Sequence, residues 1–386
     1  MIPAGILLLL SALAQLATGN HMFTSHIYKN FRKDVKGSLV FSPLAAETVL
    51  GAVALEGASG QTKKQIIDIL ENPDSEEAFE EITSFLYQST PGSFLTPAYK
   101  VYVADDYKIN RTFTRKSKDI FNVETQNVNF EDRLNTANLI NSYVDERSND
   151  RLQNLIEPIE LGPRNKIILV NTLYQSAIWK HPLISVEKDN FFTSPNDPDK
   201  IEYLSAIADF RVFHCGHLKA KYVELPFEHF NKSFVIIFPD PDNNLTNIEE
   251  HIFDYLAPHT HDYLEHVGPV SVKIPKFSTT IKLDFKKYLQ AINVKKLFNP
   301  GEAELPGISD KKGLYVNSIP QKAFINITER GNDPPDNGGC LRPHIPLGPG
   351  PVIFPKFTLN ANRPFFYYIR DNKSTLLLFV GRFNNK

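Results

Sequence analysis

The sequence predicts an α+β protein, because helical patterns dominate its first third and β-strand patterns dominate the rest. The chain has 386 residues, 42% of them hydrophobic, with 28 Phe and 15 Tyr. This apolar content suits a large core and excludes a disordered chain or a disulfide-stapled miniprotein. The 42 Lys and Arg residues nearly balance the 44 Asp and Glu residues. Neither nucleic acid nor an anionic membrane is therefore expected as a partner.

The N-terminal segment has the pattern of a secretory signal peptide. An apolar run at residues 6–16 is followed by small residues, and it is too short for a comfortable membrane span. We expect residues 1–19 to be removed and the protein to be secreted and extracellular; the alternative is a buried N-terminal helix. Next, Phe23, Ile27 and Phe31 recur at helical spacing and predict an amphipathic helix.

A short strand and further helices follow in the first third. Residues 39–41 are strand-like, and a helical pattern begins after the Ser42-Pro43 break. Residues 61–70 and 76–87 are amphipathic and predict two more helices.

From Lys166 onward the pattern changes to strands. The expected strands lie at residues 167–170, 221–226, 233–239 and 270–275. Near the end, residues 365–369 and 376–380 flank a charged turn and predict a hairpin of buried strands. The C-terminal segment should therefore belong to the core.

The sequence contains no known catalytic motif, such as G-x-S-x-G, a phosphate-binding loop, a dinucleotide fingerprint or H-E-x-x-H. Two histidine groups could supply zinc ligands, but neither has a third spaced ligand with a supporting partner. They are His214, Cys215 and His217, and His259, His261 and His266. We interpret them as surface or strand-end residues. No metal, no cofactor and no enzymatic activity are predicted.

In a secreted protein, Asn-x-Ser/Thr sequons become possible glycosylation sites. We expect attachment at four acceptors in polar segments: Asn110, Asn231, Asn244 and Asn372. A fifth acceptor, Asn326, lies inside an apolar strand pattern and should be unmodified. The cysteines Cys215 and Cys340 could form one bridge, remain free or pair with another chain.

Eight ordered segments of the chain resemble the serpin superfamily of serine protease inhibitors. They are residues 39–43, 57–62, 169–179, 223–227, 274–277, 321–325, 362–365 and 369–382. The resemblance implies one α+β domain at residues 20–386, with three β-sheets, about nine α-helices and an exposed reactive-centre loop at about residues 329–362. It also implies inhibition by strain release, in which a cut loop inserts its hinge into the central sheet as an extra strand.

The hinge departs from the pattern of inhibitory serpins, in which several alanines follow a Gly-Thr-Glu run. After Gly331, this chain reads Asn332-Asp333-Pro334-Pro335-Asp336-Asn337-Gly338-Gly339-Cys340. Both prolines lack the backbone donor that a central strand needs. We expect them to keep residues 332–355 outside the central sheet and exposed. Either Asp333 or Asp336 would also face the sheet interior as an unpaired carboxylate.

No trypsin-type bait residue is evident in the loop, which is longer than usual for the family. The plausible window includes Leu341, Arg342 and Ile345. Arg342 and Ile345 each precede a proline, and such bonds are poor protease substrates. Arg342 is therefore interpreted as an ordinary solvated residue.

The resemblance also places two groups of residues around the hinge. The first group should mark the point where the hinge enters the sheet and consists of Trp179, Lys276 and Glu329. An ion pair is expected between Lys276 and Glu329. The second group should form a hydrogen-bonded cluster under the parting strands: Ser42, Ala45, Asn171 and Gln321. Ala45 and Gln321 replace the usual Ser and His, which suggests relaxed selection on sheet opening.

Two functions remain open from the sequence. The first is a secreted, monomeric, non-inhibitory serpin that acts as a carrier, an interaction protein or a protease decoy. The second is a genuine serine-type endopeptidase inhibitor with an unusual loop. The partner would be an extracellular serine protease, as target or as cleaving enzyme, or an unidentified ligand. We further predict that Cys215 and Cys340 are not bonded to each other, because Cys215 should lie on an early strand of the second sheet, away from the loop.

Overall fold

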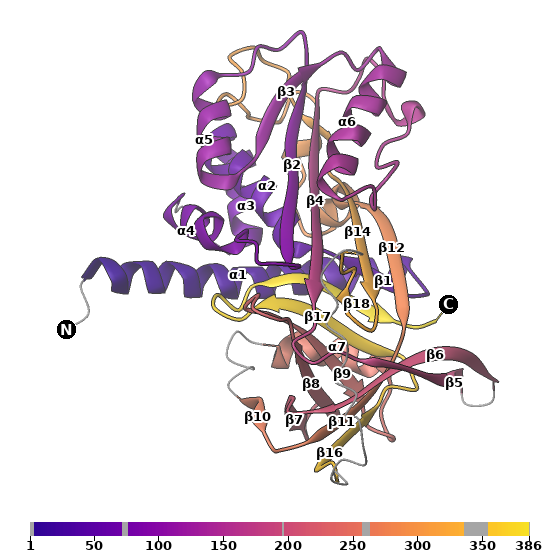
Figure 1. Cartoon of the computed structure of the whole chain (residues 1–386). Coiled ribbons are helices and arrows are strands. Elements are labelled where there is room, and N and C mark those ends of the chain that lie inside the picture. Colours follow the sequence, from indigo (N-terminus) through magenta and orange to yellow (C-terminus); the bar gives the residue numbers. More distant parts are fainter. Residues whose placement is uncertain (1–3, 72–75, 195–196, 257–262, 336–353, 386) are drawn as a thin grey trace.

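The computed structural model describes residues 4–71, 76–194, 197–256, 263–335 and 354–385. Within these ranges it has three β-sheets and eight α-helices, against about nine expected. The central sheet fills the upper half of the molecule, and the other two sheets lie in the lower half (Figure 1). The helices are α1 (Ala4–Asp34), α2 (Pro43–Ala52), α3 (Gly60–Leu70), α4 (Glu76–Leu86), α5 (Arg111–Phe121), α6 (Arg133–Arg147), α7 (Leu245–Tyr255) and α8 (Phe285–Ala291).

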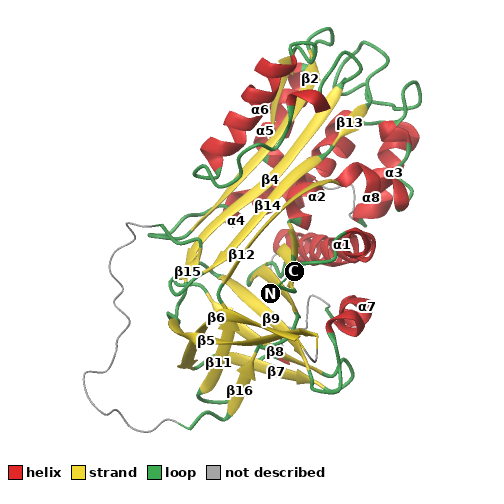
Figure 2. Ribbon diagram, turned by 90° about the vertical axis from the view of Figure 1, so that its right-hand side faces the viewer, coloured by secondary structure: helices red, strands yellow, loops and turns green. Residues whose placement is uncertain are grey.

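The central sheet has the strand order β12-β14-β15-β4-β2-β3, and β13 pairs with β4. Its strands are β2 (Phe94–Ala104), β3 (Glu124–Val128), β4 (Ile167–Ile178), β12 (Phe277–Asp284), β13 (Val316–Ser318), β14 (Pro320–Ile327) and β15 (Gly331–Asn332). Helices lie on both sides of this sheet, with α6 on one side and α2 on the other (Figure 2). Every residue of β4 is consequently buried, which explains its continuous apolar sequence.

The two smaller sheets form the lower half of the molecule. One has the order β1-β18-β17-β9-β8-β7-β10, and the other has the order β16-β11-β6-β5. Their strands are β1 (Leu39–Phe41), β5 (Ile184–Ser194), β6 (Asp197–Ala208), β7 (Arg211–Cys215), β8 (Ala220–Pro226), β9 (Lys232–Pro239), β10 (Glu265–His266), β11 (Val270–Pro275), β16 (Phe357–Asn360), β17 (Phe365–Asp371) and β18 (Leu377–Phe383).

The C-terminal hairpin is central to the lower core, as the sequence predicted. Strands β17 and β18 are buried at every position. The short strand β1 pairs antiparallel with β18, so that Leu39 lies opposite Arg382. Segments from the two ends of the chain therefore share one sheet.

The N-terminal helix α1 is continuous from Ala4 to Asp34. Phe23, Ile27 and Phe31 are buried, as their spacing predicted, and Leu16 and Ala17 are buried as well. The apolar N-terminal segment and the amphipathic helix thus form one helix here, and removal of residues 1–19 stays a prediction. None of the described helices combines the length and the apolar character needed to cross a membrane.

A buried carboxyl group lies between α1 and α2. Glu47 on α2 is only 3% exposed, and its Oε2 accepts a hydrogen bond of 2.6 Å from the Asn20 amide on α1. Its Oε1 finds no hydrogen-bond partner within the described residues. Burial raises the pKa of Glu47 to about 8, so the native protein holds this group protonated at neutral pH.

This burial predicts a pH-dependent cost in stability. In the unfolded chain Glu47 ionises near its ordinary pKa of 4.5, whereas in the folded chain it ionises only near 8. Its contribution should therefore destabilise the fold progressively from about pH 4.5 to about pH 8. Glu47→Gln should be more stable than the parent at pH 7.5 and nearly equal to it at pH 4.5, measured by urea unfolding at each pH. The exposed control Glu131→Gln should show no such trend, and an equal trend in both variants would contradict the assignment.

Candidate functional site

The first residues of the hinge, Gly331 and Asn332, already lie inside the central sheet. Strand β15 is placed between β4 and β14. Gly331 pairs with Ile178 and Asn332 with Ala177 on β4, and Asn332 also pairs with Ile327 on β14. The expectation that the loop stays outside the sheet from residue 332 onward was therefore wrong at Asn332.

Local chemistry explains why these two residues enter the sheet. A side chain at Gly331 would collide with the carbonyl of Ala177, so only glycine permits this close approach. The Asn332 side chain accepts a 3.0 Å hydrogen bond from the Asn326 N–H and donates to the Gln175 carbonyl oxygen and Oε1 at 3.3 and 3.1 Å. Asn332 thus bridges the two strands with its amide as well as with its backbone.

Asp333 faces the sheet interior, as expected for one of the two hinge aspartates, but it is not unpaired. The residue is 3% exposed. Its Oδ2 accepts from the Tyr174 hydroxyl at 2.6 Å and from Arg151 Nε at 3.0 Å. Its Oδ1 accepts from the Asn326 amide at 3.2 Å. The expectation of an uncompensated buried carboxylate was therefore wrong, because three side chains from elsewhere in the sequence converge on it.

The chain leaves the sheet directly after Asp333. Asp333 has a left-handed backbone conformation with φ of 41°, which directs the chain away from the strand. Pro334 and Pro335 follow without regular structure and are half-buried. The prediction that the two prolines lie outside the sheet is therefore confirmed, whereas the prediction that they are exposed was wrong. Asp336, Cys340, Leu341, Arg342 and Ile345 lie outside the described residues.

The predicted base of the loop forms as expected. Trp179 is buried and stacks on Phe227 with 4.7 Å between ring centroids. Its indole N–H donates to the Thr328 carbonyl at 3.0 Å, and its backbone N–H donates to the Arg330 carbonyl at 2.8 Å. One aromatic residue thus fixes the end of β14 and the approach to the hinge.

The expected ion pair at the loop base is present, with 2.8 Å between Lys276 Nζ and Glu329 Oε1. The Ser185 hydroxyl donates to the same oxygen. Burial alone would raise the pKa of Glu329, but the hydrogen bonds from Lys276 and Ser185 outweigh it and lower the pKa. Both partners are about one third exposed, so the pair orients the segment more than it stabilises the fold.

The cluster under the parting strands is also assembled, with Gln321 at its centre. The Gln321 Oε1 accepts from the Ser42 backbone N–H at 2.7 Å. Its Nε2 donates to the Ser42 carbonyl, the Asn171 carbonyl and Asn171 Oδ1 at 2.9, 3.0 and 2.8 Å. Ala45 contributes its backbone N–H, which donates to Ser42 Oγ at 3.2 Å. The amide of Gln321 therefore satisfies this buried site without a histidine.

The family profile described as serpin (serine protease inhibitor) matches residues 18–386. The chain belongs to the serpin family. This serpin is 28% identical to alaserpin of Manduca sexta, with 92% of this chain and 90% of the relative covered. It is 27% identical to an antitrypsin of Bombyx mori, with 96% and 94% covered. Serpin48 of Tenebrio molitor, described as a highly specific serpin, superposes with a TM-score of 0.82 at 28% identity, with 96% and 98% covered.

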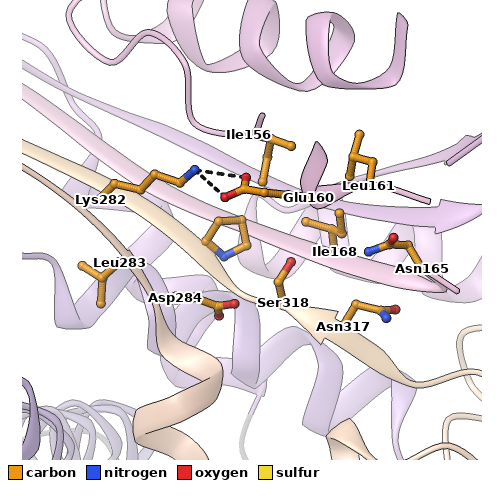
Figure 3. A pocket seen from close by; sticks show the side chains of 11 residues that line it. Ile156, Glu160, Leu161, Asn165, Ile168, Lys282, Leu283, Asp284, Asn317 and Ser318 are labelled. Carbon is orange, nitrogen blue, oxygen red and sulfur yellow. Dashed lines mark hydrogen bonds and ion pairs between the residues drawn. The ribbon is translucent and has the colours of Figure 1, made fainter. Parts of the chain in front are cut away.

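A cavity of about 540 Å³ lies at the far end of the central sheet of this serpin. Figure 3 shows Glu160 and Lys282 paired across it, with Lys282 Nζ 2.8 and 3.0 Å from the two carboxylate oxygens. Asp284 caps α8 by accepting from the Lys286 N–H, and Asn317 accepts from the Lys166 N–H. These polar groups have structural partners, and they form no nucleophile–base pair.

Other sequence predictions have mixed outcomes in this serpin. Cys215 ends β7 as a buried free thiol. Cys340 lies outside the described residues, so the prediction about this pair stays a prediction. No metal-binding group of His, Cys, Asp and Glu occurs in the described ranges. His214 and His266 instead contact Asp240 and Asp209, whereas His259 and His261 lie outside the described residues.

The sequon residues differ in accessibility. Asn231 and Asn244 are exposed. The amide nitrogens of Asn110 and Asn372 donate to Pro306 O at 3.1 Å and Ser233 Oγ at 2.9 Å. Glycan attachment at these four sites stays a prediction. The Asn326 amide donates to Asp333 at 3.2 Å, and its lack of a glycan stays a prediction as well.

Proposed function

We propose that this protein is a secreted, monomeric, non-inhibitory serpin that a protease can cleave without being trapped. One observation carries the proposal: the hinge pairs through Gly331 and Asn332 and then leaves the sheet at Asp333 and Pro334. A trap needs the strand to continue past this point, where two successive residues lack a backbone donor. The apolar N-terminal segment and the exposed sequons support secretion.

The prolines oppose insertion because each lacks a backbone N–H and so removes a ladder hydrogen bond from a central strand. In addition, Asp333 would have to lose its contacts with Arg151 and Tyr174 if the strand moved deeper or changed register. The driving force for insertion should therefore be small.

The alternative is a genuine inhibitor of a serine-type endopeptidase. Two features favour it: relatives carry inhibitor names, and the loop base with Trp179, Lys276 and Glu329 is retained. In this case insertion would have to accommodate Pro334 and Pro335 at a bulge.

Incubation with a panel of serine and cysteine proteases tests the proposal. We expect cleavage within residues 340–356 with the protease left fully active. No complex should survive boiling in SDS, because the acyl-enzyme is hydrolysed before the loop can insert. A covalent complex in good yield with any protease would establish the inhibitor alternative instead. A catalytically inactive Ser→Ala protease serves as the control for non-covalent association.

A further inference from the structure

Arg151 lies on the connection between α6 and β4, far from the loop in sequence. Its guanidinium is half exposed, whereas the Asp333 carboxylate that it contacts at 3.0 Å is almost fully buried. Tyr174, on the adjacent strand β4, is 3% exposed and donates to the same oxygen. The contact thus joins the first residues of the loop to the segment that follows α6.

The environment of Asp333 is built for a charged group. Beyond the contacts to its carboxylate, the Asp333 N–H donates to the Asn326 carbonyl at 2.8 Å, and its carbonyl accepts from the Ser176 hydroxyl at 2.8 Å. Burial and the hydrogen bond to Asp333 raise the pKa of Tyr174, so its hydroxyl remains a donor at every physiological pH. Burial would lower the pKa of Arg151, but the Asp333 carboxylate outweighs this and raises it.

We propose that Arg151 and Tyr174 act as positioning residues that latch Asp333, and so hold the hinge at its present depth in the sheet. The proposal rests on the proposed function, because it assigns the device that sets the resting position of the non-inhibitory loop. Pro334 prevents deeper insertion, and the latch prevents withdrawal. Without the Arg151 charge, the buried carboxylate loses its compensating partner, and the hinge can regain solvation by moving outward.

The test uses the intact, uncleaved protein and two local readouts. The first is hydrogen exchange of the amides at residues 331–333 and at Asn326, whose N–H is bound by Asn332. The second is the fluorescence of Trp179, the single tryptophan of the chain, whose backbone and indole N–H groups bind Arg330 and Thr328. Both report the hinge position without requiring a protease or a ligand.

Arg151→Gln should accelerate exchange at these amides at least about tenfold, and it should shift the tryptophan emission. Arg151→Lys should retain most of the protection that Arg151→Gln loses, because lysine keeps the charge. Arg151→Glu should accelerate exchange more than Arg151→Gln does. Tyr174→Phe should have a smaller effect in the same direction. The matched control is Arg164→Gln, an exposed arginine on the same connection, which should behave as the parent protein.

Equal hinge exchange in Arg151→Gln and Arg164→Gln would overturn the latch. So would an effect spread over the whole sheet with no rescue by lysine, since this would indicate a structural role only. These outcomes are independent of protease trapping. An SDS-stable protease complex would disprove the proposed function, but it would not change the hydrogen-exchange rates by which the latch is judged.

Discussion

Cleavage of the loop between Cys340 and Lys356 should leave the thermal midpoint of this protein within about 3 °C of the uncut value. Full insertion of a hinge would add a ladder of backbone hydrogen bonds and buried side chains to the central sheet, and the midpoint would rise strongly. Here the hinge stops at Asp333, and the next two residues are prolines without donors. The measurement is differential scanning calorimetry of intact and nicked protein, with the nick located by mass spectrometry.

Two variants separate the contribution of the prolines from that of Asp336. Pro334→Ala with Pro335→Ala should allow a partial rise after cleavage. The same pair combined with Asp336→Ala should allow a larger rise, because insertion past the prolines would otherwise bring the Asp336 carboxylate into the sheet. The control Pro346→Ala with Pro349→Ala leaves the hinge unchanged and should give no rise. A large increase in the natural protein after cleavage would mean that prolines do not block insertion, and the inhibitor function would replace the one proposed.

Gln321→Ala should lower the free energy of unfolding by about 3 kcal/mol. The side chain is fully buried, and its loss leaves the Ser42 N–H without its acceptor and removes the donor of Asn171 Oδ1. It also creates a cavity beneath β14, which adds to the cost. Urea unfolding at pH 7 measures the change.

A matched control and a conservative variant make this result specific. Gln153→Ala removes an exposed glutamine side chain near the same sheet and should change stability by less than about 0.5 kcal/mol. Gln321→His introduces the residue usual in inhibitory serpins. Its free energy of unfolding should fall less than that of Gln321→Ala, because the ring can keep one donor and one acceptor. A loss in Gln321→Ala no larger than in Gln153→Ala would show that the cluster contributes little to stability.

The sequence predicts those parts of this fold in which burial follows a regular period. Phe23, Ile27 and Phe31 identify α1 because one face of that helix is buried. The C-terminal hairpin was recognisable from two continuous apolar runs, residues 365–369 and 376–380, on either side of a charged turn. The serpin resemblance placed Trp179, Lys276 and Glu329 correctly around the loop base.

The surroundings of Asp333 were not predictable in this way. Arg151 and Tyr174 are separated from it by 182 and 159 positions, and no local pattern marks them as its partners. The only available signal was weak: Tyr174 and Ser176 alternate along β4 and so face the same side of the sheet. From the sequence alone, a hinge carboxylate is expected to destabilise the inserted strand, because the distant groups that compensate its charge cannot be identified. Glu47 was missed for the same reason, because its burial depends on packing between α1 and α2.

The pairing of β1 with β18 also constrains when this protein can fold during its synthesis. Asn20 on α1 accepts a hydrogen bond from the Leu377 N–H, 357 positions later in the chain, and Leu39 lies opposite Arg382. A ribosome releases the N-terminal segment first, so α1 and β1 must wait for almost the whole polypeptide before their partners exist. Contacts of such sequence separation slow folding and leave apolar surfaces uncovered in the nascent chain. The lower core therefore closes only after translation has passed β18.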